Sequence, residues 1–161
     1  MAIVKTEILS IRQFLCNTNL QIPHFQRPYK WSIKNAIQLL EDMQRFNTTK
    51  SYRIGTIVIH KENDKYNIVD GQQRTLTFIL IVKALYKLKL IKNKELQQQL
   101  KTTHDTAFQP KFKNDTSKKN IKENYLEIER RIFSMDESTI DFFLNKCEIT
   151  HFVIDLSLIH I

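Results

Sequence analysis

Residues 70–75, which read DGQQRT, place a carboxylate, two amides and a guanidinium next to one another. Residues 66–69 before them are typical of a short buried strand, and residues 76–90 after them form the longest apolar helical run of the chain. A strand that turns directly into a helix brings free backbone N–H groups and the positive end of the helix dipole to one point. Such a junction attracts an anion, most often a phosphate.

Two interpretations of this stretch stay open. In the first, Arg74 contacts a phosphate with its planar fork of donors, and Asp70 either orders the turn or faces a metal ion bound to the phosphates. In the second, Asp70 as N-cap and Gln73 three residues later form a capping box that needs no ligand. Spacing alone favours the capping box, because short motifs often arise by chance. The stretch is not a P-loop, since G-x-x-x-x-G-K-[ST] does not occur.

A second stretch, residues 22–31, contains two of the three prolines, the single tryptophan and another Gln-Arg pair, Gln26 and Arg27. Each proline pushes the residue before it out of the helical region, so the segment is predicted to be extended. We expect its polar residues, pinned inside a stiff aromatic loop, to join Arg74 at a ligand. The aromatic side chains are predicted only to pack the segment onto the core: Phe25, Tyr29 and Trp31.

Three segments together resemble a known family. They are IPHFQRPYKW at residues 22–31, YRIGTIVIH with YNIVDGQQRTLT at residues 52–77, and SKKNIKENY at residues 117–125. In combination they resemble the N-terminal domain of the GmrSD-type, modification-dependent restriction proteins of bacteria, over about residues 8–155. That domain is similar to the ParB/sulfiredoxin fold. Both Gln-Arg motifs carry the resemblance together, because either one alone is weak.

The resemblance implies an α+β fold in which a small β-sheet, made of a hairpin plus short strands, packs with several α-helices. It implies a nucleoside triphosphate as ligand, with Mg²⁺ as a candidate companion, and hydrolysis of that nucleotide with DGQQR as the signature of the activity. The residues expected to take part in catalysis are Asp70, Gln73 and Arg74. The residues expected to hold the nucleotide or its phosphates are Gln26, Arg27, Gly71, Gln72, Arg74 and Thr75.

The expected function is therefore a nucleotide-binding, NTP-hydrolysing regulatory domain of a phage-defence restriction system, in which nucleotide state gates DNA cleavage. DNA is the expected partner of the intact protein, and the nuclease is expected in a downstream domain or subunit. The alternative is a ParB-like module in which the nucleotide switches DNA binding without hydrolysis. A third option is a lysine-rich DNA-binding fragment whose motifs only cap helices.

Length and composition favour one cytoplasmic domain. The 161 residues are 42% apolar, which is enough for one packed core. The N-terminus lacks the layout of a signal peptide, and the longest unbroken apolar run, residues 78–82, is far too short to span a bilayer. Cys16 and Cys147 have no metal-ligand spacing and are expected to stay reduced. Only two glycines occur and one is Gly71, which indicates a backbone demand at the motif.

The net charge of +8 is concentrated in one part of the chain. Residues 83–122 hold eleven lysines against three acidic residues, and this excess equals the net charge of the whole chain. Such a block can bind nucleic acid through its phosphates, but it can equally be a solvated lysine-rich surface. It contains no arginine, which weakens any role in base readout. The five histidines form no metal-dependent nuclease cluster in the sequence, so no metal site is predicted.

Periodicity and capping signals predict the elements that must position these residues. The predicted helices cover residues 11–16, 33–46, 72–90, 92–100, 117–133 and 136–147, and residues 101–116 are predicted to loop. The predicted strands cover residues 20–22, 52–60, 66–69 and 149–155, with the middle two as a hairpin. The second helix is expected to bury Ile33, Ile37, Leu40 and Met43. The third is expected to be central and to bury Leu76, Ile79, Leu80 and Leu85.

We expect residues 1–155 to form a single, incomplete ParB-like restriction-system domain. The last six residues, 156–161, match the translation of CTGTCTCTTATACACATC, a transposon end that serves as an adapter in DNA library preparation. We therefore expect them to be encoded by adapter sequence and to be dispensable. The alternative is an ordinary apolar tail that continues the alternation of the last strand.

Overall fold

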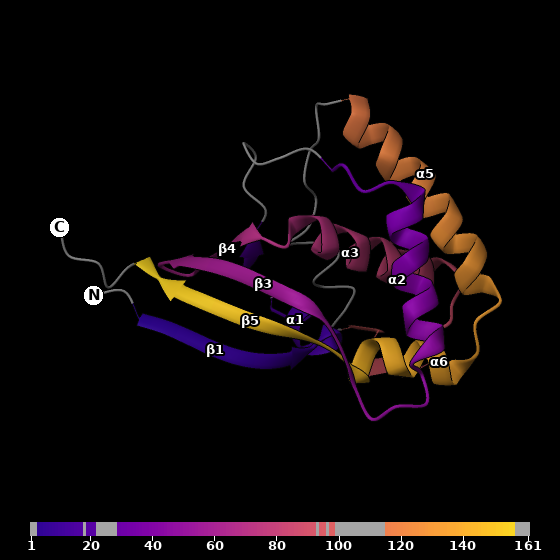
Figure 1. Cartoon of the computed structure of the whole chain (residues 1–161), viewed down its shortest axis with the longest axis horizontal. Coiled ribbons are helices and arrows are strands. Elements are labelled where there is room, and N and C mark those ends of the chain that lie inside the picture. The colour runs from indigo at the N-terminus through magenta and orange to yellow at the C-terminus, as the bar shows by residue number, and fades with distance from the viewer. Residues whose placement is uncertain are drawn as a thin grey trace.

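The computed structural model describes residues 3–17, 19–21, 29–92, 94–95, 97–98 and 115–156. The chain forms an α+β fold with one mixed sheet, as predicted (Figure 1). The strands are β1 (Ile3–Ser10), β2 (Leu20–Gln21), β3 (Tyr52–Glu62), β4 (Lys65–Asp70) and β5 (Cys147–Asp155). The helices are α1 (Ile11–Leu15), α2 (Ile33–Arg45), α3 (Gln72–Lys87), α5 (Asp115–Phe133) and α6 (Glu137–Asp141), followed by a π-helix at Phe142–Lys146.

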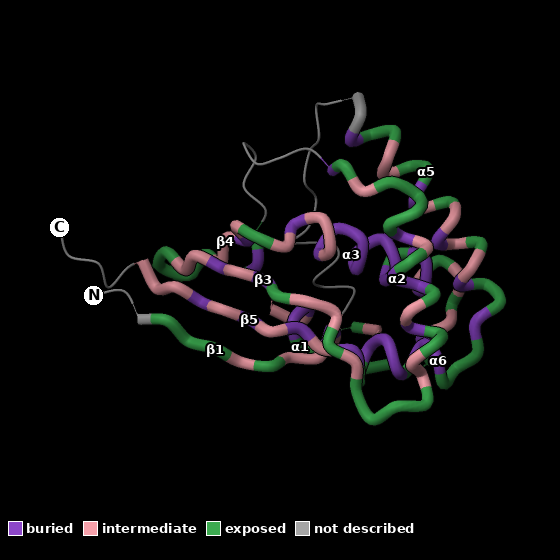
Figure 2. Tube along the Cα trace, in the orientation of Figure 1, coloured by how far each residue is buried: buried purple, intermediate pink, exposed green. Residues whose placement is uncertain are grey.

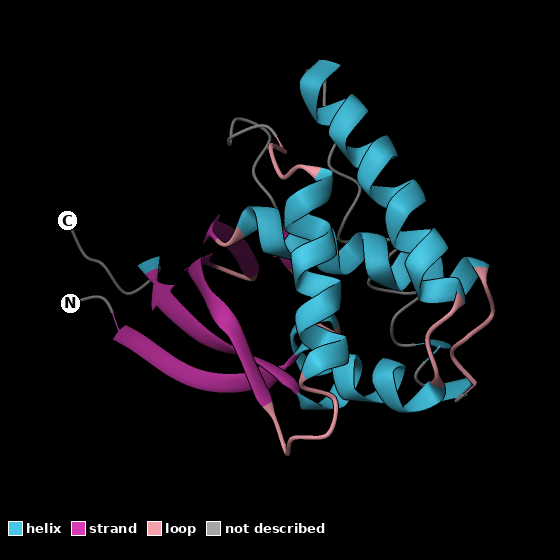
Figure 3. Ribbon diagram, turned by 45° about the vertical axis from the view of Figure 1, so that its right-hand side comes forward, coloured by secondary structure: helices cyan, strands magenta, loops and turns pink. Residues whose placement is uncertain are grey.

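The strands of the sheet pair in the order β1-β5-β3-β4-β2. β3 and β4 form an antiparallel hairpin, which confirms that prediction. β5 lies between β1, to which it is antiparallel, and β3, to which it is parallel. β2 pairs in parallel with β4. Figure 3 shows the strands gathered at one side of the molecule and most of the helices at the other.

The hairpin turns at Asn63, whose φ of 55° lies in the left-handed region. Asparagine is among the few non-glycine residues that adopt this conformation readily. The two strands then pair from Glu62 with Lys65 up to Val58 with Asp70, so the hairpin carries Asp70 to the end of β4. The chain leaves the sheet at this point and enters α3.

The helix α3 is the central element, as predicted. It is apolar nearly all round, and the four residues expected in the core are all buried: Leu76, Ile79, Leu80 and Leu85. The helix ends at Lys87, three residues earlier than predicted. Lys89 has a φ of 56°, and the Leu90 N–H donates to the Leu85 carbonyl at 3.0 Å, so a Schellman-type turn stops the helix there.

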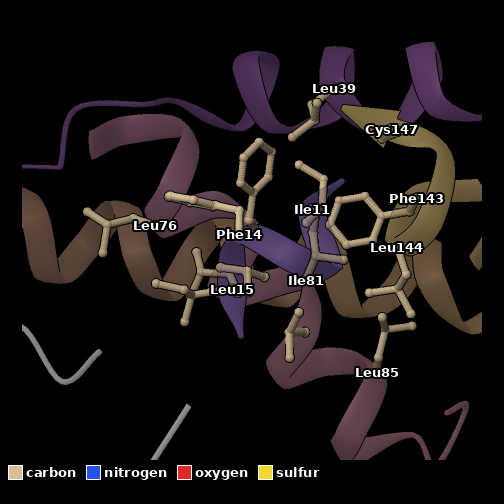
Figure 4. Close-up of a cluster of buried hydrophobic side chains, with 14 of the residues drawn as sticks. Ile11, Phe14, Leu15, Leu39, Leu76, Ile81, Leu85, Phe143, Leu144 and Cys147 are labelled. Atoms are coloured by element: carbon tan, nitrogen blue, oxygen red, sulfur yellow. The ribbon is translucent and has the colours of Figure 1, made fainter. Parts of the chain in front are cut away.

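The first helix, α1, begins as predicted. The Gln13 N–H donates to Ser10 Oγ at 3.1 Å, and the Ser10 N–H donates to Gln13 Oε1 at 2.9 Å. These reciprocal bonds form the expected capping box. The buried side chains of α1 then join the cluster in Figure 4, which brings together residues from three helices, the π-helix and β5: Ile11, Phe14, Leu15, Leu39, Leu76, Ile81, Leu85, Phe143, Leu144 and Cys147.

The buried face of α2 differs in part from the predicted one. Leu40 and Met43 are buried as expected, but Ile33 is 36% exposed and Ile37 is only half-buried. Ala36 and Leu39 are buried in their place. The buried stripe therefore starts three residues later than predicted, on a helix that contacts α5. Periodicity gives the width of such a stripe but does not say which neighbouring helix will cover it.

The strand β1 was not predicted. It pairs along its whole length with β5, from Ile3 with Asp155 to Ser10 with Glu148. Its apolar side chains Val4 and Ile8 are 58% and 52% exposed. Apolar residues on the outward face are the reverse of the alternation by which a half-buried strand is recognised, which explains the omission (Figure 2).

The predicted helix over residues 136–147 is correct at its start and wrong at its end. Asp136 accepts the Thr139 N–H at 2.9 Å as the N-cap of α6. After Asp141 the chain forms one π-helical turn, and β5 begins at Cys147. Alternate residues of β5 are buried: Cys147, Ile149, His151 and Val153.

Several predictions fall outside the described residues. These are residues 101–114 of the predicted loop, residues 93, 96, 99 and 100 of the predicted helix over residues 92–100, the tail from residue 157 onwards, and the site residues Gln26 and Arg27. The helix α5 begins at Asp115, so the loop predicted over residues 101–116 is wrong at its last two residues. Within the part of the chain that the structure describes, no helix combines the length and hydropathy needed to cross a membrane.

Candidate functional site

Gly71 turns the chain from β4 into α3. It is the N-cap residue, with φ 90° and ψ 16°, a left-handed conformation that glycine adopts without steric cost. A Cβ at this position would also lie 2.4 Å from Ile57 Cδ1 and 3.1 Å from the Thr56 carbonyl oxygen. Both the backbone angle and the packing against β3 therefore require glycine. This confirms the backbone demand predicted at the motif.

The capping-box interpretation of Asp70 and Gln73 is wrong. Gly71 is the N-cap of α3, and no side chain caps the helix. Asp70 Oδ1 instead accepts the Gly71 N–H at 3.0 Å. Gln73 Oε1 accepts the N–H groups of Lys30 and Trp31, at 2.7 and 3.1 Å. The first-turn N–H groups of α3 have no acceptor within the helix, so the geometry of an anion site is kept.

The side chains of Gln72 and Thr75 are buried and bonded to the protein itself. Gln72 Nε2 donates to the Ile68 carbonyl at 2.8 Å, and Thr75 Oγ1 donates to the Gly71 carbonyl at 2.9 Å. Gln72 is 7% exposed and Thr75 is fully buried. Both side chains therefore stabilise the turn from its buried side, whereas Asp70 is exposed to solvent.

The guanidinium of Arg74 lies against β3 at Gly55. A Cβ at Gly55 would come within 3.1 Å of both Cζ and Nε of Arg74, so the missing side chain makes room for the guanidinium. Among the residues that the structure describes, none forms a hydrogen bond or ion pair with Arg74. The half-buried positive charge is thus held beside the start of α3 and is available to a ligand.

These groups surround a cavity of about 300 Å³. Its lining combines one carboxylate, one guanidinium, two amides and an indole, and consists of Trp31, Val69, Asp70, Gly71, Gln72, Gln73 and Arg74. Cations and helix N-termini stabilise anions in such a place, and this one has the size of a small-ligand pocket. The cavity can therefore take a phosphate-bearing ligand at the first turn of α3.

The segment Tyr29–Trp31 is clamped between α3 and α5. From α3, Gln73 accepts two of its N–H groups, as described above. From α5, Ser117 Oγ accepts the Tyr29 N–H at 2.9 Å, and Asn120 Nδ2 donates to the Tyr29 carbonyl at 3.1 Å. Asn124 Nδ2 donates to the Trp31 carbonyl at 2.8 Å. Three stretches that are far apart in the sequence thus meet at one wall of the cavity.

A buried chain of hydrogen bonds connects α5 to α3 through Tyr29, whose side chain is fully buried. Asn124 Nδ2 donates to the Tyr29 hydroxyl at 2.9 Å. Thr77 Oγ1 donates to the Gln73 carbonyl, so the Tyr29 hydroxyl must donate to Thr77 Oγ1, also at 2.9 Å. Burial raises the pKa of the Tyr29 phenol, and the bonds to Thr77 and Asn124 offset this in part. The phenol therefore stays protonated and keeps its role as a donor.

A second cavity, of about 330 Å³, lies between β1, β5 and α1. Both lysines in its lining are paired: Lys5 Nζ lies 2.7 Å from Glu7, and Lys61 Nζ lies 3.9 Å from Asp155. Its charges balance, so this cavity offers less to a phosphate than the one beside Arg74. We therefore place the candidate site at the start of α3, although the other cavity is slightly larger.

The sequence of the chain matches a known protein family. The family model of the GmrSD restriction endonuclease, N-terminal domain, matches residues 11–158, which is nearly the whole chain. The chain belongs to this family. The resemblance inferred from the Gln-Arg segments is thereby confirmed, and the chain is part of a restriction system. A comparison with curated proteins found no match.

The described part of this GmrSD domain brings together some of the predicted site residues. Asp70, Gly71, Gln73 and Arg74 line the cavity with their polar groups or backbone, whereas the side chains of Gln72 and Thr75 are turned to the protein. No group of three or more histidine, cysteine, aspartate or glutamate side chains is placed to hold a metal ion within the described ranges.

Three features of the site in this GmrSD domain were missed by sequence reasoning. Gly55 supports Arg74, Trp31 lines the cavity, and the α5 amides Asn120 and Asn124 clamp the segment before α2. The scarcity of glycine was a usable signal for Gly55, which is one of only two in the chain. Nothing in the local pattern around the two asparagines indicates which distant backbone groups they will bond.

Proposed function

We propose that this GmrSD domain binds a nucleoside triphosphate with its phosphates at the first turn of α3, and that it hydrolyses the nucleotide. The observation that carries the proposal is Arg74, whose guanidinium lies against Gly55 and which lines a cavity together with a helix N-terminus. Backbone N–H groups and a guanidinium are the groups that proteins use to hold phosphate oxygens.

The proposed roles follow from where each side chain lies. Arg74 neutralises phosphate oxygens, and Asp70 positions the attacking water or a hydrated Mg²⁺ ion. Gln73 acts by position, because its side-chain oxygen Oε1 already accepts two N–H groups of the Tyr29–Trp31 segment. Gln72 holds the turn through the bond to Ile68. Gln26 and Arg27 precede this segment in the chain and remain proposed phosphate ligands by their resemblance to the family motif.

The restriction-system context suggests what nucleotide binding could regulate. A nucleotide that joins α3, α5 and the Tyr29–Trp31 segment can change how this domain meets its partners. We infer that nucleotide state gates DNA cleavage by a nuclease part of the intact protein, for which DNA is the expected partner.

A nucleotide switch without hydrolysis is the second candidate. One observation favours it: Asp70 is the single carboxylate in the described lining of the cavity. One carboxylate together with Arg74 is sufficient for binding, but most phosphoryl-transfer sites use further groups to hold the metal ion and the water.

Calorimetric titration with each of the four ribonucleoside triphosphates and Mg²⁺ tests the binding. A charge-assisted hydrogen bond contributes roughly 1.5–3 kcal/mol, so Arg74→Ala should weaken binding about 10- to 100-fold. The matched control is Arg130→Ala, because Arg130 is 68% exposed on α5 and paired with Glu127 away from the cavity. Equal affinity of the Arg74 and Arg130 variants would contradict the proposed site.

Release of inorganic phosphate, measured with and without DNA, separates the two candidates. Turnover that Arg74→Ala abolishes supports hydrolysis. Tight binding with no phosphate release under either condition supports the switch.

A further inference from the structure

Trp31 is the single tryptophan of the chain and the one aromatic residue in the described lining of the cavity. Its backbone is fixed from two sides. The Trp31 N–H donates to Gln73 Oε1 at 3.1 Å, and its carbonyl accepts Asn124 Nδ2 at 2.8 Å. Helices α3 and α5 therefore hold the Trp31 backbone together, at the wall of the cavity that the residue lines.

Tyr29, two residues earlier, has a purely structural role and serves as a comparison for Trp31. Its ring is fully buried, and its hydroxyl bonds to Thr77 and Asn124. The indole of Trp31 forms no hydrogen bond with the described residues. Its ring is half-buried and packs against the edge of the core. The exposed part of this large, rigid ring lies at the wall of a polar cavity, where a flat ligand surface can cover it.

We propose that Trp31 is the base-binding residue of the site, and that its indole stacks on the nucleobase of the nucleotide whose phosphates lie at Arg74. This inference rests on the proposed function and adds the part of the ligand that the phosphate contacts do not explain. Every nucleobase has a π-face, so stacking tolerates all four bases. The affinities for the four nucleoside triphosphates should therefore agree within about fivefold, and all four should exceed that for inorganic tripolyphosphate.

Fluorescence tests the contact directly, because Trp31 is the single tryptophan, and excitation at the long-wavelength edge of its absorption avoids the five tyrosines of the chain. Titration with ATP should quench or shift the emission, with a midpoint that agrees with the calorimetric affinity. Inorganic tripolyphosphate, which has the phosphates without a base, should bind with little change in emission. This measurement needs no substitution and so does not depend on a variant that folds.

Two substitutions extend the test. Trp31→Leu removes the ring and keeps an apolar side chain, so binding of ATP should weaken about 10- to 100-fold while binding of tripolyphosphate stays the same. Trp31→Phe keeps a stacking ring and should restore most of the affinity for ATP. Arg74→Ala should weaken the binding of both ligands.

The possible failures are distinguishable. If ATP binds in the calorimeter without any change in emission, and Trp31→Leu binds it as well as the unaltered chain does, the inference about Trp31 is overturned and the proposed function stands. If neither ATP nor tripolyphosphate binds the unaltered chain, the proposed function and the inference fall together.

Discussion

Gly55 in β3 and Gly71 at the N-cap of α3 are the two glycines of the chain, and they contribute to the site for different physical reasons. Gly71 is required by its backbone angle and by its contact with Ile57. Gly55 instead leaves room for a neighbouring side chain, since a Cβ there would come within 3.1 Å of the Arg74 guanidinium. The same substitution at the two positions should therefore have different effects.

Gly71→Ala should destabilise the fold by roughly 1–3 kcal/mol, because alanine is strained at a φ of 90° and its Cβ would overlap Ile57 Cδ1. Gly55→Ala should change the free energy of unfolding by less than about 1 kcal/mol, because the end of a flexible side chain can move aside. Chemical denaturation of both variants measures the difference. Equal losses of stability would show that the turn at Gly71 is not as the structure describes it.

Among the elements, α3 is the helix in which we test the energetic cost of a cavity in the core. Leu80 is 8% exposed in the part of α3 that is apolar on all sides. Leu80→Ala should cost roughly 2–5 kcal/mol, as for other buried leucines. The matched control is Leu126→Ala on α5, where the side chain is 56% exposed and the cost should be close to zero. Urea midpoints of the two variants decide the matter, and a negligible shift for Leu80→Ala would make α3 a peripheral helix.

Elements with strong local signals were predicted well from the sequence. The hairpin of β3 and β4, the capping box at Ser10 and the apolar run of α3 depend on neighbours within a few residues. β1 and the buried face of α2 depend on which distant element covers them, and here the prediction was missing or shifted. Local periodicity contains no information on that choice.

In the candidate site, too, features set by neighbouring residues could be predicted and features set by distant residues could not. The turn at Gly71 could be inferred from a strand, a glycine and a helix in succession. The support of Arg74 by Gly55 and the use of Gln73 as an acceptor for the Lys30 N–H could not, because both contacts join residues that are about 20 to 45 positions apart and depend on the tertiary fold. The capping box favoured by spacing alone was wrong for this reason.

At the scale of the whole molecule, the site lies where three separate parts of the chain meet. The turn after β4, the Tyr29–Trp31 segment and the first half of α5 contact one another through Gln73, Asn120 and Asn124. A ligand that bridges the turn and this segment would stabilise the contact between α3 and α5. This is a physical route by which nucleotide binding can reach other parts of a restriction system.

Backbone NMR of the two glycines tests the central claim most directly. A chain labelled with [¹⁵N]glycine has a Gly55 and a Gly71 amide signal, and the Gly55→Ala variant assigns them by removing one. Addition of a nucleoside triphosphate should move both signals in the unaltered chain, because the phosphates approach the N–H groups beside Gly71 and draw Arg74 away from Gly55. In the Arg74→Ala variant the same nucleotide concentration should leave the Gly71 signal almost unmoved. Two stationary signals in the unaltered chain at millimolar nucleotide would contradict a phosphate site at the start of α3.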